Sequence, residues 1–281
     1  MKPVAPDRFP QPIPGTIDAH AHLYSRELEQ DRDQVLARAW QAGLEAIIEV
    51  GTSAPSSRRA LELSKQDPRI HPVVGLHPHE AKHLEAQRAD LEQLAASGDF
   101  VGVGEIGLDF YRNNSPPDEQ DATFRWQLDL ARQHDLPFVI HSRDADDATF
   151  AILSEWTDRV GHYLGAERPI GMLHSYAGDP NLAARYLERG ILISIPGTVT
   201  YKNNDRGQNV ARAIPLTGML LETDCPYLTP VPHRGRRNEP AWVPLVGEVL
   251  ASLHGRTLAA VARQTTENAR RFYRLPNAPG S

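Results

Sequence analysis

The sequence predicts an α/β protein that folds as a single (β/α)8 barrel of the TIM type. Eight short runs rich in Val, Ile or Leu recur along the chain, and each ends in polar or glycine residues. Stretches with helical periodicity lie between most of these runs. Strands that alternate with helices indicate parallel strands joined by helical crossovers. Eight such units favour a closed barrel over an open doubly wound sheet, and 281 residues is an ordinary length for one.

The predicted strands are the eight apolar runs, taken in chain order. They cover residues 16–22, 46–52, 70–78, 100–109, 137–143, 169–175, 191–198 and 218–226. Helical periodicity is clearest at 28–43, where Val35, Leu36, Ala39 and Trp40 form one stripe, and at 118–135. The last two helical segments, 242–254 and 258–274, are expected to complete the outer ring of helices.

Composition restricts the class of protein. A hydrophobic share of 40% and a charged share of 23% are those of a globular domain, and no apolar run approaches the roughly 20 residues that span a bilayer. The start of the chain lacks a signal-peptide pattern, and the single cysteine, Cys225, excludes an internal disulfide framework. A small buried thiol is the expectation for it. We therefore expect a cytoplasmic protein with no membrane partner.

The chain is expected to form one domain with short tails. Residues 1–14 are dense in proline and read as a loose extended tail, residues 15–275 as the barrel, and residues 276–281 as a second tail. The net charge of −6 argues against a protein that coats nucleic acid by general basicity. It does not exclude a nucleic-acid enzyme, because bound cations would add positive charge locally.

The first predicted strand places Asp18, His20 and His22 at alternate positions. Side chains two apart share a face in a strand but not in a helix, so the three would face one way and the small apolar residues 17, 19 and 21 the other. Two imidazoles and a carboxylate on one buried face suggest a metal site. Asp18 is open to two interpretations: it fixes the tautomer of a ligating imidazole, or it caps the start of the strand.

Metal-type ligands end five of the eight predicted strands, where barrel enzymes place their chemistry. The candidates are His20 and His22, Glu105, His141, His174 and Asp224. Each has a structural alternative: a hydrogen-bonded core histidine, a salt bridge from Glu105 to Arg143, or a turn cap by Asp224. All four lysines lie away from the strand ends, which argues against a carboxylated-lysine bridge and favours Glu105 as the bridging ligand.

The motifs taken together resemble the TatD family of metal-dependent deoxyribonucleases, within the amidohydrolase-like barrels. The resemblance covers nearly the whole chain after the tail. It rests on "DAHAHL", "GLHPHE", "GEIGLDFY", "FVIHSRDA", "GTVTYKNN", "LLETDCPYL" and "HRGRRNEP". One departure is "HSYAG" at His174, where the family more often has Cys, Phe and Ser after the histidine.

The resemblance implies a centre of two divalent ions. His20, His22 and Asp224 would hold one ion, His141 and His174 the other, and Glu105 would bridge both. Two ions carry four positive charges against two carboxylates, and the positive remainder favours a phosphodiester substrate and a metal-activated hydroxide as nucleophile. The imidazoles suit Zn²⁺ or Mn²⁺ by ligand type, whereas the family is described as Mg²⁺-dependent.

Substrate contacts are expected around the same strand ends. The resemblance implies that His77 contacts the scissile phosphate, and Glu105, Asp224 and His77 are the candidate catalytic residues. Arg112 and the cluster of Arg234, Arg236 and Arg237 are candidate phosphate clamps, with one of that cluster expected to act and Arg234 and Arg237 preferred. Rim tyrosines could stack bases or only line the rim: Tyr111, Tyr201 and Tyr227.

The sequence therefore predicts a monomeric metal-dependent deoxyribonuclease, a 3′–5′ exonuclease on single-stranded DNA. Two alternatives stay open. A small-molecule amidohydrolase or esterase could use the same two-metal centre, because one barrel hosts many chemistries. A binding protein that has lost its chemistry is the other, and the complete ligand set speaks against it. Asn268 is expected to be structural, connecting the last helix to the barrel.

Overall fold

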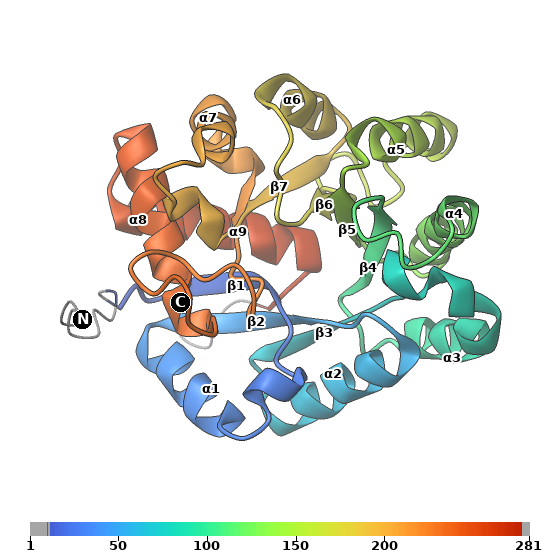
Figure 1. Cartoon of the computed structure of the whole chain (residues 1–281), viewed down its shortest axis with the longest axis horizontal. Helices are drawn as coiled ribbons and strands as arrows, with labels where there is room; N and C mark the ends of the chain where they lie inside the picture. Colours follow the sequence, from blue (N-terminus) through green and yellow to red (C-terminus); the bar gives the residue numbers. More distant parts are fainter. Residues whose placement is uncertain (1–9, 11, 277–281) are drawn as a thin grey trace.

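The computed structural model describes residue 10 and residues 12–276, and in it eight parallel strands form one barrel (Figure 1). The strands follow chain order around the sheet, from β1 to β8. The two end strands also meet: Ala21 pairs with Cys225, and the Asp224 amide donates to the His20 carbonyl at 2.9 Å. The predicted (β/α)8 barrel is confirmed.

All eight predicted strands are present, several of them shorter at the carboxyl end than the apolar runs suggested. Residues after β3, β7 and β8 continue the apolar pattern but leave the sheet to form the loops of the barrel mouth. The strands are β1 (Thr16–Ala21), β2 (Leu44–Val50), β3 (Ile70–Val74), β4 (Gly102–Asp109), β5 (Phe138–Arg143), β6 (Gly171–Leu173), β7 (Ile191–Ile195) and β8 (Met219–Leu221).

Helices follow the strands and surround the sheet (Figure 1). Several begin at a residue suited to satisfy the free amides of a first turn; Asp179, for example, accepts hydrogen bonds from two amides at the start of α6. The helices are α1 (Arg32–Gln41), α2 (Ala54–Gln66), α3 (Leu84–Ala96), α4 (Pro117–Gln133), α5 (Asp146–Val160), α6 (Pro180–Glu188), α7 (Asp205–Ala213), α8 (Val243–His254) and α9 (Leu258–Tyr273). Short 3₁₀ turns include η1 (Arg26–Leu28) and η2 (Pro78–His83).

Helix α9 does not join the outer ring as the sequence suggested; it crosses the end of the barrel where the strands begin. The Asn268 amide group donates to the carbonyls of Leu216 and Met219, at the start of β8. The Tyr273 hydroxyl donates to the carbonyl of Ala19 in β1. The expected structural role of Asn268 is thus observed, and α9 closes the floor of the barrel.

The buried apolar side chains form two layers. One layer lies between the sheet and the surrounding helices. The other fills the barrel interior, because it joins Ile17, Val50, Val139 and Leu220 from four strands around the sheet with Phe272 of α9. At roughly 25 cal/mol per Å² of buried apolar area, these layers are the main source of stability.

Most of both predicted tails lies outside the described residues. The residues outside are 1–9, 11 and 277–281. Of the rest, Ile13 is buried and its amide donates to the carbonyl of Ala42. In the described part of the chain, no helix combines the length and apolar character needed to cross a membrane.

Two glycines allow strands β3 and β4 to approach closely beneath the mouth. A Cβ atom added to Gly75 would lie 2.4 Å from the carbonyl carbon and oxygen of Gly104, the residue before Glu105. These atoms of Gly104 belong to the backbone, so they cannot move aside as the end of a flexible side chain would.

We predict that Gly75→Ala destabilises the fold by about 1–3 kcal/mol, because the added methyl group overpacks this contact. Urea unfolding measures the change. The matched control is Gly247→Ala in α8, where the added Cβ would meet the end of a flexible leucine side chain at 3.0 Å and alanine favours the helix. Equal unfolding midpoints for both variants would contradict the prediction.

Candidate metal centre

Six candidate ligands converge at the carboxyl ends of the strands. They come from different strand ends and the loops that follow them, and five are buried while His141 is half-buried. Together with His77 they form three overlapping groups, and within each group the ligand atoms lie within 4.8 Å of one another. The six are the residues expected from the sequence: His20, His22, Glu105, His141, His174 and Asp224.

Glu105 lies at the centre of this cluster and faces histidines with both oxygens. Its Oε2 lies 3.6 Å from His20 Nε2 and 3.5 Å from His22 Nε2. Its Oε1 lies 2.8 Å from His141 Nδ1 and 3.0 Å from His174 Nε2. Oε1 also lies 3.4 Å from His77 Nε2. The two carboxylate oxygens therefore face different imidazoles, an arrangement that fits a bridging ligand.

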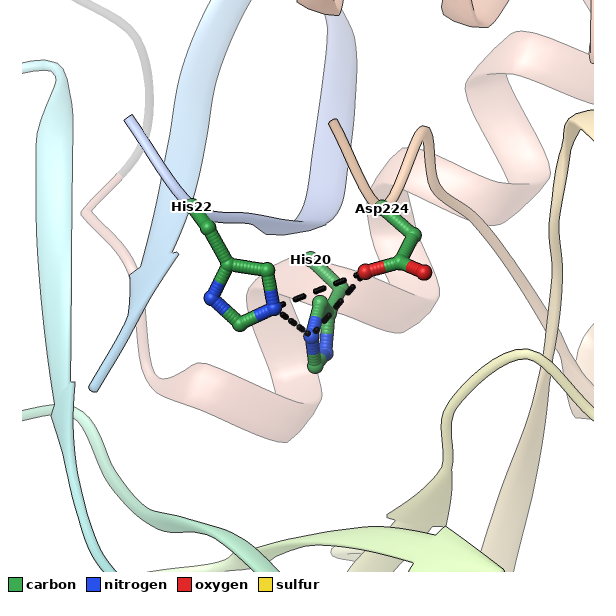
Figure 2. A group of neighbouring side chains, drawn as sticks. All are labelled: His20, His22 and Asp224. Carbon is green, nitrogen blue, oxygen red and sulfur yellow. Dashed lines mark hydrogen bonds and ion pairs between the residues drawn. The ribbon is translucent and has the colours of Figure 1, made fainter. Parts of the chain in front are cut away.

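Asp224 forms a group with His20 and His22, the two histidines that face Oε2 of Glu105 (Figure 2). Its Oδ1 lies 3.5 Å from His22 Nε2 and 3.8 Å from His20 Nε2. The two imidazole nitrogens are themselves 3.2 Å apart. Figure 2 shows all three side chains pointing toward one another, with the second oxygen of Asp224 directed away.

The hydrogen bonds behind two of the histidines show that this donor set suits a cation. His22 Nδ1 lies 2.9 Å from the carbonyl of Val50, so Nδ1 must carry the proton. His141 Nε2 lies 3.2 Å from a carboxylate oxygen of Asp109, so that nitrogen carries the proton too. In the neutral rings the remaining lone pairs face Glu105 and Asp224. Such a convergence of acceptors is stable only with positive charge among them.

The pKa values in the cluster reflect the same need for positive charge. Burial opposes charging of His22, but Asp224 and Glu105 outweigh it and raise its pKa to about 9. Burial also disfavours the charged form of Glu105, yet His174 and His77 bring its pKa well below the usual value. His20 differs, because burial and the neighbouring His174 lower its pKa to about 3. The centre can thus be neutralised by protons or by divalent cations.

The backbone of β4 departs from regular alternation directly at Glu105. The pairing with β5 is irregular between Val103 and Ile106, both of which pack in the outer layer. The Glu105 amide donates to the carbonyl of Gly51, after β2, at 2.8 Å. This irregularity turns the Glu105 side chain into the barrel mouth.

Strand β1 shows a similar break, which corrects the expected alternation. Ile17 and Ala19 pack in the interior layer, although residues 17, 19 and 21 were all expected to face away from the histidines; only Ala21 packs in the outer layer. The pairing with β2 is irregular between Asp18 and Ala21. His20 faces the mouth because the strand changes its alternation before it.

Asp18 connects β1 to β8 rather than orienting an imidazole. Its Oδ1 accepts the amide of Thr223 at 2.9 Å and its Oδ2 accepts the Thr223 hydroxyl at 2.5 Å. Burial outweighs these hydrogen bonds and raises the pKa of Asp18 to about 8. Neither interpretation from the sequence describes this role, because Thr223 is 205 residues away along the chain.

His77 belongs to one of the candidate groups, with Glu105 and His141, but presents a donor instead of a lone pair. Its Nδ1 accepts the amide of His79 at 3.1 Å, so the neutral ring carries its proton on Nε2, 3.4 Å from Glu105 Oε1. Burial outweighs the attraction of Glu105 and lowers the pKa of His77 to about 4. A neutral ring with an N–H at the mouth suits a phosphate oxygen better than a metal ion.

Asp109 is a buried carboxylate that the sequence interpretation missed as a site residue. One of its oxygens, Oδ2, lies 2.8 Å from His79 Nε2 and 3.2 Å from His141 Nε2. Burial works against its charge, but the hydrogen bonds from His141, Arg112 and His79 lower its pKa. Its position at the end of β4, in "GEIGLD", was the available signal.

Two further buried glutamates support the mouth and were also missed. Glu49 accepts hydrogen bonds from the amides of Leu23 and Tyr24 at 2.7 and 2.8 Å, and so holds the loop after His22. Glu222 accepts the amide of Ser175 at 2.6 Å and lies 3.7 Å from His174 Nδ1. In the sequence, the only sign of this supporting role was that each glutamate alternates with apolar residues, Glu49 in β2 and Glu222 directly after β8.

The candidate phosphate-binding arginines differ in their surroundings. Arg237 forms two hydrogen bonds of 2.7 Å to the carboxylate of Asp31, so its guanidinium is already engaged. Arg234 is exposed and lies 4.3 Å over the ring of Tyr201. Arg112 is exposed near the end of β4. Of the three, Arg234 and Arg112 present accessible charge at the rim.

Comparison with known proteins identifies the family. The profile of the TatD related DNases matches residues 17–274. The chain belongs to this family.

Several TatD relatives extend over nearly the whole chain. An uncharacterized metal-dependent hydrolase, YabD, from Bacillus subtilis is 38% identical, with 92% of this chain and 99% of that protein covered. A protein of Erwinia billingiae named 3′–5′ ssDNA/RNA exonuclease TatD is 36% identical at the same coverage. The crystal structure of YjjV, a TatD homolog from Escherichia coli K12, has a TM-score of 0.86 at 29% identity and covers 94% of this chain and all of that one.

The role of Asp109 behind His141 can be tested directly. We predict that Asp109→Asn lowers affinity for Mn²⁺ by about 10- to 100-fold, because the amide no longer orients His141 as the carboxylate does. Titration calorimetry of the purified protein measures this. Asp121→Asn, which alters a surface ion pair with Arg125 in α4, is the control and should bind as the unaltered protein does. Unchanged affinity in Asp109→Asn would refute the role.

Proposed function

We propose that this protein is a metal-dependent nuclease that releases nucleotides from the 3′ end of single-stranded DNA. The observation that carries the proposal is the position of Glu105, whose two oxygens face different histidines. Membership of the TatD related DNases supports the reaction class. The polarity and the single-stranded substrate follow the name of the Erwinia relative, which also includes RNA.

The proposed centre holds two divalent ions. His20, His22 and Asp224 would bind one, His141 and His174 the other, with Glu105 shared. Bound ions would supply Lewis-acid activation of water and would neutralise the charge of the phosphate. The imidazole-rich ligand set favours Zn²⁺ or Mn²⁺, with Mg²⁺ as the third candidate. All of these ligands come from a single chain, so a monomer suffices for the proposal.

The other residues have roles that their hydrogen bonds define. His77 would donate from Nε2 to an oxygen of the scissile phosphate, since its Nδ1 is occupied by the His79 amide. Asp224 directs Oδ1 to the imidazoles, which leaves Oδ2 to accept a proton from the attacking water (Figure 2). Arg112 would contact phosphates farther along the strand, where guanidinium groups bind well.

A substrate screen tests this function. We expect Mn²⁺, Mg²⁺ or Zn²⁺ to support shortening of a 5′-labelled single-stranded DNA from its 3′ end, with a 3′-blocked strand resistant. Double-stranded DNA, single-stranded RNA, an abasic strand and simple amides and esters complete the panel. Hydrolysis of an amide or ester with no cleavage of any nucleic acid would refute the nuclease and favour the small-molecule alternative.

A pair of variants tests the shared ligand. We predict that Glu105→Ala loses both ions and at least about 1,000-fold of activity, whereas His141→Ala mainly loses one ion, because Glu105 is proposed to serve both. Elemental analysis after reconstitution gives the metal content, and circular dichroism verifies the fold. Similar small losses in both variants, or no divalent metal in the folded unaltered protein, would exclude the two-metal centre.

A further inference from the structure

The large apolar side chains most exposed in the described part of the chain gather in two loops at the barrel mouth. Phe110 and Tyr111 follow β4, and Tyr227 and Val231 follow β8. Elsewhere in the described residues such side chains are at least partly covered. Exposed apolar surface at one end of a molecule indicates a binding surface.

The two loops lie on opposite sides of the candidate metal centre. The strands follow chain order around the barrel, and β8 returns beside β1. In a ring of eight strands, β4 and β8 are therefore diametrically opposed. A ligand that lies across the mouth and reaches both loops passes over Glu105 and Asp224.

Tyr111, on the β4 side, forms a cationic aromatic surface. Its side chain is 57% exposed. The guanidinium carbon of Arg143 lies 4.0 Å from the ring centroid, and that of Arg112 lies 5.6 Å from it. An aromatic ring accompanied by two arginines can stack a base and also attract the phosphates attached to it.

Tyr227, on the β8 side, forms an aromatic surface next to a candidate metal ligand. It is 53% exposed, and its ring centroid lies 6.2 Å from that of His22. This ring can stack a base directly beside the candidate metal centre.

We propose that Tyr227 stacks the 3′-terminal base of a single strand, and that Tyr111, with Arg112 and Arg143, stacks the preceding base. The proposal rests on the proposed nuclease function and assigns the direction in which the substrate lies. The terminal nucleoside has no phosphate on its far side, so it suits Tyr227, whose ring lies beside His22 of the candidate metal centre. The remainder of the strand carries one charge per nucleotide and suits the cationic side.

Binding of defined oligonucleotides tests the proposal independently of cleavage. The probe is a fluorescein-labelled single-stranded oligothymidylate with phosphorothioate linkages, which resist hydrolysis, and fluorescence anisotropy reports its affinity. Two further probes lack either the terminal base or the penultimate base. Each missing base should weaken binding to the unaltered protein by about tenfold, the scale expected for one base stacked on an aromatic ring.

The tyrosine variants should remove these penalties selectively. In Tyr227→Ala the penalty for the missing terminal base should fall to within about twofold, while the penultimate penalty stays near tenfold; in Tyr111→Ala the reverse is expected. Tyr227→Phe and Tyr111→Phe keep the ring and should keep both penalties. Val231→Ala, a change of an exposed side chain without a ring in the β8 loop, is the matched control and should also keep both.

The outcomes distinguish base stacking by the two tyrosines from the proposed nuclease chemistry. If both alanine variants keep the tenfold loss of affinity for each missing base, the stacking is overturned. If Tyr227→Ala removes the penultimate penalty and Tyr111→Ala the terminal one, the direction of the strand is overturned. Hydrolysis of bis(4-nitrophenyl) phosphate with added metal tests the phosphodiesterase chemistry without any base. Its absence, together with selective loss of the base penalties, would contradict the proposed reaction but leave the base-stacking surfaces supported.

Discussion

The convergence of five imidazoles on the buried carboxylate of Glu105 is the constraint on which the mouth of this barrel depends. Neither the carboxylate nor the imidazoles could be left there without positive charge between them. The surrounding structure maintains the convergence: Val50, Asp109 and Glu222 lie behind three of the histidines. The close approach of Gly75 to Gly104 sets the backbone from which Glu105 projects.

The strands and the ligands they carry could be predicted from the sequence, because both depend on local pattern. Apolar runs mark strands, and in a parallel barrel every strand ends at the same face, so residues at run ends must meet. His141 and His174 are examples: nothing but the position after an apolar run is needed to place them together.

The features that were missed or misread depend on partners far along the chain. Asp18 is bound by Thr223, and Arg237 by Asp31, at separations of more than 200 residues. The irregularities of β1 and β4 are set by neighbouring strands, not by the residues themselves, so a period-two pattern could not reveal them. Helix α9 has an ordinary amphipathic sequence, and only the open floor of the barrel determines where it packs.

The closure of the floor by α9 also has a practical consequence. Ile13 packs beside the start of β2, and Leu275 lines a hollow on the floor together with Ile17 and Ala46. The described chain thus enters and leaves on the side away from Glu105. An enzyme attached to a solid support through residues of this floor would keep its mouth open to solution, so long polymers could reach it without steric hindrance from the surface.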